Sequence, residues 1–425
     1  MSRTLVIKKK TLFYCSLFFL LLIAPLMTSY ISVFSSVDEA VTIIGLVLVF
    51  DNYFIKNHTA GRNVFFLLIG IVFVGTLSTI VYRISPSLKV SLYDFVLFVK
   101  PFVLFLMFYG VSAEIKKEIL NGFNVLAKIL FLYTFVYFVL HTLFGVFLLS
   151  NFFSILGNMA QVSWLRVVCL NIIAATNEKK ITKKYIVLFY ISLFVHGISG
   201  FASALFASLT LYLYLYRENK ERKLNIWKIV LLGCVALFFA YGDLQEYIFN
   251  GYAPRARLLR YGFVTATRYF PLGSGFASYG SEMAKRYYSK LYYQYGFDKV
   301  WSMSPENNLP GSKVGTLNDC YLGMIVGQYG WFGLCFYAGI IYSMYKILTK
   351  GLGNTYSKAV SISTLITILS SVMVSNNTSS HFGICMYAVI GLTSISCDSK
   401  TMTIKGKMDD ENINNYSRLQ RRKVP

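Results

Sequence analysis

The sequence has few charged residues, few prolines and few histidines. Only 14% of its 425 residues are charged, against about 25% in an ordinary soluble domain. It contains 8 prolines and 4 histidines. With 56% hydrophobic residues, this composition excludes an intrinsically disordered chain, a coiled coil and a collagen-like chain.

Its cysteines and histidines follow no pattern typical of a disulfide framework or a metal site. No CxxC, paired histidines or carboxylate–histidine spacing occurs among the 7 cysteines and 4 histidines. We expect the cysteines, and His141, His196 and His381, to be packing residues. There is also no P-loop, no GxGxxG after a strand and no GxSxG. We therefore expect no metal, no cofactor and no ATP- or dinucleotide-dependent chemistry.

Long apolar stretches are abundant, and the mean hydropathy is +0.55. A membrane helix needs about 20 mostly apolar residues to cross about 30 Å of hydrocarbon. The stretches that we identify as candidate spans are 11–30, 37–55, 63–82, 91–112, 123–145, 152–175, 185–197, 200–216, 226–242, 319–345, 359–375 and 380–397. We predict an all-α fold, a polytopic transmembrane helix bundle of about 12 spans with one large, partly helical outer loop.

The net charge of +22 and the pI near 9.6 first raise nucleic acid as a partner. However, 27 of the 41 basic residues lie in alternate loops and in the C-terminal tail, whereas the short loops between hold only Arg83 and Lys89. This bias follows the positive-inside rule and predicts that both termini are cytoplasmic. Because no compact basic domain exists, we expect no nucleic-acid partner.

Four regions follow from this distribution: 1–242, an N-terminal bundle of about nine spans; 243–318, the large outer loop; 319–397, the C-terminal spans; and 398–425, a basic cytoplasmic tail. The outer loop is dense in Tyr, Phe and Trp, which argues against disorder. We predict a helix over 257–269, ended by a turn at 270–276, and a second amphipathic helix over 281–295.

The loop also holds nine basic residues, which are Arg255, Arg257, Arg260, Arg268, Lys285, Arg286, Lys290, Lys299 and Lys313. Arginines bind a diphosphate through bidentate contacts, and aromatic faces stack on sugar rings. This combination favours a polyprenyl-diphosphate-linked glycan as ligand. The alternative is an amphipathic helix that lies on anionic headgroups.

Four features together resemble one known family. The predicted arginine-led helix ends in a Pro-x-Gly-x-Gly turn at 271–276 (PLGSGF). Residues 318–322 (NDCYL) are followed by 327–333 (GQYGWFG). A small-residue turn at 196–204 (HGISGFASA) joins two close spans. With about twelve spans and one large outer loop late in the chain, the sequence resembles the Wzy-type O-antigen, capsular and exopolysaccharide polymerases, which are related to the O-antigen ligases.

The sequence departs from the family at two places. Family members often carry an arginine in the small-residue turn, where this chain has Gly200. The related ligases place a histidine near the exit of the loop, where this chain has Asn318 and Asp319. These differences favour a polymerase over a ligase and argue against a histidine-based mechanism.

The resemblance implies a glycosyltransferase of the bacterial plasma membrane. A growing glycan would be transferred from undecaprenyl diphosphate to the distal sugar of a new lipid-linked repeat unit. The undecaprenyl-diphosphate-linked oligosaccharide and the lipid bilayer are the expected partners, and the family leads us to expect a chain-length regulator protein as well. Neither a nucleotide sugar nor a metal is expected.

The candidate catalytic residues are Asp319 as general base and Arg257 as a ligand of the departing diphosphate. Asp319 has an alternative role as the N-cap of the following span. Glu306 is a second carboxylate for the substrate site, with a salt bridge in the loop as its alternative role.

The remaining residues assigned to substrate binding are Arg255, Arg260, Arg268, Arg166 and Tyr321. Arg166 is included because a charge deep in a predicted span is costly and usually functional. Its alternatives are pairing with a neighbouring residue or a misplaced span boundary.

Three rival functions remain. A flippase for the same lipid-linked unit would also have about twelve spans, but a transporter should concentrate polar groups at the membrane midplane and show paired halves. An O-antigen ligase would run the same chemistry on another acceptor. A noncatalytic scaffold or export partner is the third.

Overall fold

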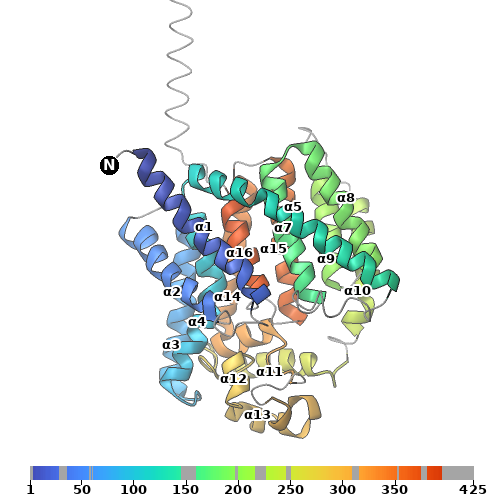
Figure 1. The fold of residues 1–425 in the computed structure, drawn as a ribbon. Helices are drawn as coiled ribbons and strands as arrows, with labels where there is room; N and C mark the ends of the chain where they lie inside the picture. The colour runs from blue at the N-terminus through green and yellow to red at the C-terminus, as the bar shows by residue number, and fades with distance from the viewer. Residues whose placement is uncertain are drawn as a thin grey trace, which may run out of the picture.

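The computed structural model describes residues 3–27, 36–56, 59, 61–144, 159–196, 200–215, 226–245, 250–308, 315–351, 354–374 and 381–394. Throughout this part the secondary structure is helical, with fifteen α-helices and no strand (Figure 1). The prediction of an all-α chain is confirmed for these residues.

Twelve of the helices form a bundle. They are α1 (Arg3–Met27), α2 (Val37–Phe50), α3 (Arg62–Tyr82), α4 (Leu88–Tyr109), α5 (Ala113–Phe144), α7 (Met159–Thr176), α8 (Lys179–His196), α9 (Gly200–Leu215), α10 (Ile226–Leu244), α14 (Tyr321–Lys350), α15 (Thr355–Val374) and α16 (His381–Thr393). A single π-helical turn (Asp51–Ile55) extends α2. Each of the twelve apolar stretches overlaps one of these helices within the described residues.

Four of the described helices are long and apolar enough to cross a membrane: α3, α4, α5 over residues 113–137, and α14. Shorter apolar helices cover Ser163–Thr176, Ala204–Leu215 and Gly383–Thr393. Four candidate spans in one chain indicate a multi-pass membrane protein.

The centre of the bundle is built around α4. Every residue of α4 from Phe98 to Tyr109 is buried, and the helix packs against α2, α3 and α16. Apart from Lys100, this part of α4 is apolar on all sides, and an apolar helix surface of this kind needs such enclosure. Because α4 is enclosed in this way, it holds the neighbouring helices α2, α3 and α16 in place.

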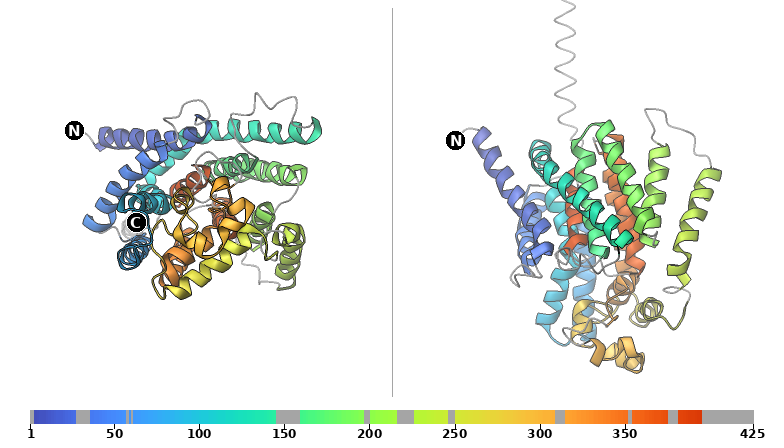
Figure 2. Two further views of the ribbon diagram at one scale, coloured as in Figure 1. Left: turned by 90° about the horizontal axis from the view of Figure 1, so that it is seen from below. Right: turned by 45° about the vertical axis from the view of Figure 1, so that its right-hand side comes forward.

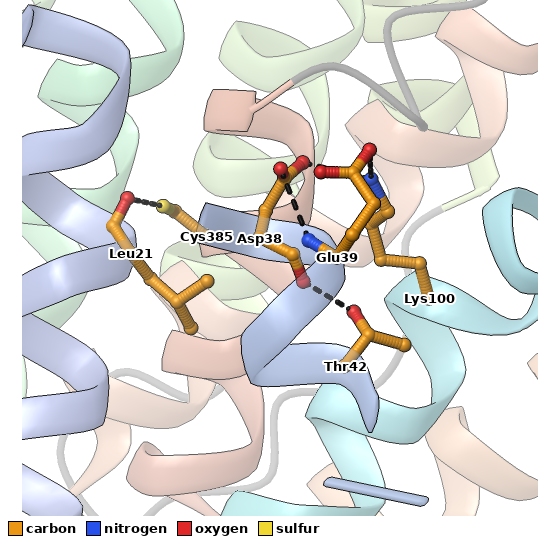
Figure 3. A network of polar contacts seen from close by, with 6 residues as sticks. All are labelled: Leu21, Asp38, Glu39, Thr42, Lys100 and Cys385. Carbon is orange, nitrogen blue, oxygen red and sulfur yellow. Dashed lines mark hydrogen bonds and ion pairs between the residues drawn. The ribbon is translucent and has the colours of Figure 1, made fainter. Parts of the chain in front are cut away.

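A charged network lies inside this apolar bundle (Figure 3). Lys100 Nζ on α4 lies 2.8 Å from Asp38 Oδ2 and 2.8 Å from Glu39 Oε1, at the start of α2. In addition, Cys385 Sγ on α16 donates to the carbonyl of Leu21 on α1, 3.0 Å away. A buried charge is tolerated when it is paired, so this network fixes where α2 joins α4.

The remaining helices form a cap, which we define as residues 250–308 and 315–320. It contains α11 (Pro254–Arg268), α12 (Glu282–Arg286), α13 (Lys290–Gln294) and three 3-10 turns (Phe297–Lys299, Trp301–Met303 and Glu306–Asn308). The cap covers the end of the bundle opposite the chain's N-terminus (Figures 1 and 2). Buried Tyr279, Tyr292 and Phe297 give it a core of its own, which explains why this aromatic-rich segment folds.

The cap is joined to the bundle at a break in α14. Gly330 has φ 63° and ψ −157°, a conformation that interrupts the helix. The carbonyl of Gln328 instead accepts a hydrogen bond from Gly275 N at 2.8 Å, and Phe332 N donates to the carbonyl of Pro271 at 3.4 Å. The turn at 271–276 thereby satisfies backbone groups that the broken helix leaves open.

The same turn is also fixed to α3 and α4. Phe276 N donates to Thr79 Oγ1 at 2.8 Å, and Ala277 N donates to Asp94 Oδ2 at 2.7 Å. Ser78 Oγ donates to the carbonyl of Gly273. Asp94 is buried within α4, so the turn is held by a side chain that cannot shift freely.

Two helix predictions for this region had different outcomes. The helix expected over 257–269 is confirmed. It is α11, which ends at Arg268, just before the turn. The single helix expected over 281–295 is wrong, because α12 and α13 are separate. Tyr288 adopts φ 41° and donates its hydroxyl to the carbonyl of Met303 (3.0 Å), and Ser289 Oγ accepts from Leu291 N to begin a new helix.

We predict that Gly330→Ala destabilises the protein. Its backbone conformation is essentially restricted to glycine, and such strain costs about 1–3 kcal/mol. A Cβ there would also meet the backbone of Gly273. The measurement is the unfolding temperature of the full chain in detergent. Gly251→Ala is the control, because no atom lies within 4 Å of its added Cβ; equal unfolding temperatures for both variants would contradict the prediction.

Candidate functional site

The candidate site lies where α11 crosses the start of α14. Proline at the first position of α11 suits a helix start, since its missing N–H is not needed there. A Cβ on Gly262 would lie 2.7 Å from the carbonyl oxygen of Gly323. Only a glycine permits this close approach of the two backbones. Where the two helices cross, the first turn of α11 lies beside the residues that precede α14.

Arg255 and Asp319 meet at this crossing. Arg255 Nη2 lies 3.7 Å from Asp319 Oδ2, and the two side chains are 25% and 31% exposed. Asp319 N also donates to the carbonyl of Thr316 at 3.0 Å. The pair is therefore held by the fold but remains accessible from outside the protein.

Asp319 is not the N-cap of α14, which was its alternative role. The N-cap is Cys320, whose Sγ accepts a hydrogen bond from Gly323 N at 3.3 Å. The helix begins one residue later than that alternative required. The Asp319 carboxylate is thus directed toward Arg255 instead of the helix terminus.

The surroundings of Asp319 make its carboxylate a stronger base than an ordinary aspartate. Burial raises the pKa of Asp319 above its ordinary value, and the nearby cations of Arg255 and Lys285 lower this pKa only in part. Burial also raises the pKa of the Cys320 thiol to about 11. Cys320 is therefore protonated at neutral pH, which argues against a nucleophilic thiol.

A second polar chain adjoins this pair. Lys285 Nζ donates to the carbonyl of Gly315 at 3.1 Å and to Asn318 Oδ1 at 3.3 Å. Asn318 Nδ2 donates to Glu282 Oε2 at 2.7 Å. Sequence reasoning did not assign Lys285 or Glu282 to the site, because no local spacing connects α12 to residues 318–319.

The four arginines of α11 lie on two faces. Arg255 shares the inward face with Leu258 and Gly262, at a spacing of three to four residues. Arg257, Arg260 and Arg268 share the opposite face, because positions three and eleven residues further along a helix fall near one face.

The outward arginines differ in their surroundings. Arg257 lies over the ring of Tyr252, with 5.9 Å from the guanidinium to the ring centroid. Arg260 is exposed. Arg268 Nη1 donates to Gln294 Oε1 at 2.9 Å, and a rise of 1.5 Å per residue places it about 20 Å along α11 from Arg255. One diphosphate at Arg255 is therefore out of reach of Arg268.

Two other predicted residues are not brought to the pair. Arg166 lies buried on α7, which packs against α5, α8, α15 and α16, and its guanidinium is 5.7 Å from the ring centroid of Phe189. Glu306 is exposed on the cap and accepts a hydrogen bond from Ser304 Oγ at 3.2 Å. Within the described residues, no ion pair joins Glu306 to a cation, so the salt bridge expected as its alternative is not formed there.

Tyr321 is the first residue of α14 and is buried, with its ring centroid 6.4 Å from that of Tyr337. In the sequence it directly follows Asp319 and Cys320, and its side chain packs in the core of the bundle. His141, His196 and His381 lie in described helices, but the structure does not describe their side chains, so the predictions for them stay predictions. Lys313 and the tail lie outside the described residues.

No protein-family model matches the sequence, and no curated protein is significantly similar to it. Among the residues that the structure describes, no three His, Cys, Asp or Glu side chains are arranged to hold a metal ion. Arg255 and Asp319 are the two predicted site residues that the described structure joins in an ion pair.

We predict that Arg255→Gln raises the pKa of Asp319 further, because it removes the larger of the two cationic influences that oppose the effect of burial. The carboxyl infrared band that disappears in Asp319→Asn identifies this group during a pH titration. Arg260→Gln is the control, since Arg260 is exposed on the opposite face of α11. An equal shift in both variants would show that the ion pair has no specific effect.

Proposed function

We propose that the protein is a polysaccharide polymerase of the bacterial plasma membrane. It transfers a growing glycan from undecaprenyl diphosphate onto the distal sugar of a new lipid-linked repeat unit. In this proposal the twelve bundle helices span the membrane, both termini are cytoplasmic and the cap lies on the outer side. A chain-length regulator is proposed as a protein partner.

The observation that carries this proposal is the adjacency of Arg255 and Asp319. Glycosyl transfer from a diphosphate needs a cation where negative charge develops and a base at the incoming hydroxyl. The acceptor oxygen attacks the anomeric carbon as the diphosphate oxygen leaves it, so the cation and the base must flank the same sugar. Arg255 and Asp319 are neighbours, 3.7 Å apart and partly exposed, and in this proposal the bound donor separates them, with its diphosphate at Arg255 and its sugar beside Asp319.

In the proposed reaction, the bond between the sugar's anomeric carbon and the diphosphate oxygen breaks. A bond forms from that carbon to the acceptor hydroxyl oxygen, and the hydroxyl proton passes to the Asp319 carboxylate. The diphosphate leaves with the bonding electron pair, and Arg255 stabilises its charge. The raised pKa of Asp319 makes it a better proton acceptor than an ordinary aspartate.

The outward arginines have a different role in this proposal. Arg257 and Arg260 form a positive approach to the site, which attracts the anionic donor along the cap surface. Fixing two lipid-anchored glycans on one surface also turns their encounter into a positioned reaction.

The contact between two sequence motifs gives further support. The turn at 271–276 and the segment at 327–333 belong to two of the four features on which the resemblance to the polymerase family rests, and they bind one another through backbone hydrogen bonds. Neither is distinctive alone, since glycines are common in membrane helices. Because each motif supplies hydrogen-bond partners to the backbone of the other, there is a physical reason for both to occur in one chain.

A flippase is the second candidate, because Lys100, Asp38 and Glu39 are charged residues inside the bundle, and Arg166 is also buried there. Intramembrane charges commonly mark transport pathways. A ligase remains the chemical alternative to a polymerase, with the same donor and another acceptor.

We predict that Asp319→Asn lowers polymer formation about 10²–10⁴-fold, the usual contribution of general-base catalysis. The measurement is in-vitro polymerisation from purified lipid-linked repeats, analysed by chain length on gels. Glu306→Gln is the matched control, because Glu306 is an exposed cap carboxylate with no described ion pair. Full activity of Asp319→Asn would remove this residue from the mechanism.

Deletion of the gene distinguishes the two candidate functions. Without a polymerase, lipid-linked units still cross the membrane, so we expect single repeat units on the cell surface. Without a flippase, none should reach it. Surface glycan is labelled on intact cells and sized; absence of all labelled repeats would favour the flippase.

A further inference from the structure

Asn318, which precedes Asp319 in the sequence, is held by two residues of α12. Its side-chain oxygen accepts a hydrogen bond from Lys285 Nζ at 3.3 Å, and its side-chain nitrogen donates to Glu282 Oε2 at 2.7 Å. Glu282 and Lys285 are three residues apart and therefore lie on one face of α12. We call Glu282, Lys285 and Asn318 the clamp. Because both ends of the Asn318 amide have a partner, the orientation of this side chain is fixed.

The helix that carries the clamp is itself fixed to the bundle. Met283 of α12 is buried in a small cluster with Val90 of α4 and Ala277. The helix begins at Ser281, whose Oγ accepts a hydrogen bond from Ala284 N at 3.1 Å. Because packed interiors resist displacement, α12 cannot move without disturbing its contact with α4. The clamp therefore connects the residues before α14 to the bundle.

Lys285 binds a second point of the same segment. Its Nζ donates to the carbonyl of Gly315 at 3.1 Å, so one ammonium group contacts both ends of residues 315–318. The charge of Lys285 also lowers the pKa of Asp319, the next residue in the chain. The segment that carries Asp319 is therefore held by α12, whereas Arg255 belongs to α11.

The proposed reaction requires such a support for the base. An ion pair that is partly exposed contributes little stability, and Arg255 and Asp319 form a pair of this kind at 3.7 Å. In the proposed complex the donor separates the two side chains, so Arg255 no longer holds the carboxylate. A catalytic group must nevertheless stay within about 0.5 Å of its productive position. The hydrogen bonds of the clamp do not involve Arg255, so they can persist when the donor binds.

Resting on the proposed function, we infer that Glu282, Lys285 and Asn318 are positioning residues, which hold Asp319 beside the reacting sugar. They act through the backbone that joins Asn318 to Asp319 and bind no substrate themselves. The site then has two separately supported halves. The crossing of α11 and α14 places the cation, and α12 places the base.

Asn318→Ala tests the clamp, because this change removes both of its side-chain hydrogen bonds and alters no charge. Asn307→Ala is the matched control. Asn307 Nδ2 donates to the carbonyl of Trp301 at 2.6 Å and to Ser304 Oγ at 3.3 Å, so the control also loses two hydrogen bonds of a cap asparagine, but none to the residues before α14. Unfolding temperatures of the full chain in detergent check that both variants are folded.

The first readout is the influence of Arg255 on Asp319, which requires no catalysis. The carboxyl infrared band that disappears in Asp319→Asn is titrated with and without Arg255→Gln. Lys285, the other cation that lowers the pKa of Asp319, is present throughout. We expect Arg255→Gln to shift this pKa roughly half as far, or less, in the Asn318→Ala background as in the otherwise unchanged chain.

The Asn307→Ala background should show the full shift. A shift in the Asn318→Ala background that equals or exceeds the one in the otherwise unchanged chain would overturn the inference. So would the absence of any shift in the otherwise unchanged chain, because Arg255 would then have no influence that the clamp could maintain.

The second readout is in-vitro polymerisation from purified lipid-linked repeats. We expect Asn318→Ala to lower kcat about 10–100-fold, since a misplacement of about 1 Å costs up to about 10²-fold, and to leave KM for the donor unchanged. Asn307→Ala should change neither constant. An unchanged kcat, or a rise in KM that accounts for the whole loss of activity, would show that Asn318 does not position the base.

The two proposals fail in distinguishable ways. If the wild-type chain forms no polymer but the influence of Arg255 on Asp319 depends on Asn318, the proposed reaction fails and the clamp stands as the support of the pair. If polymer forms and this influence is the same without Asn318, the reaction stands and the clamp is rejected.

Discussion

The position of the cap depends on one break in the backbone of α14. At Gly330 the helix releases the carbonyl of Gln328 and the N–H of Phe332, and the turn at 271–276 supplies partners for both. Gln328 and Gly330 are buried, and a buried backbone group left without a hydrogen-bond partner costs several kcal/mol. The turn is therefore a structural requirement of α14, and the cap cannot move away from the bundle without exposing that cost.

This constraint also explains where the charged pair forms. The turn ends α11 at one side, and the close approach of Gly262 and Gly323 fixes where α11 crosses α14. With both points fixed, only the first turn of α11 lies at the start of α14, and Arg255 is its inward-facing residue. The pair thus follows from backbone geometry, since a surface ion pair at this separation contributes little stability alone.

The sequence predicted the features that depend on local pattern. Within the described residues, the twelve apolar stretches overlap helices because hydrophobic runs are local, and α11 with its turn followed from charge spacing and Pro-Gly chemistry. Arg255 and Asp319 were each named, but nothing local pairs residues 64 positions apart. The capping role of Cys320 was missed because sulfur is a weak acceptor that cap preferences do not include. The break between α12 and α13 depends on a hydrogen bond from Tyr288 to the distant Met303, which no periodicity reveals.

The placement of the charges bears on the choice between enzyme and transporter. In the bundle, Lys100 contacts two carboxylates at once, and all three side chains are wholly or largely buried. The charges of this network are buried and paired with one another, whereas a transport site must bind and release its cargo. In the cap, by contrast, Arg255 and Asp319 are partly exposed and separated by 3.7 Å, a distance that leaves the pair weak enough for an anionic ligand to displace. The charged groups suited to a changing ligand are therefore those beside the start of α14, which favours chemistry at the cap over passage through the bundle.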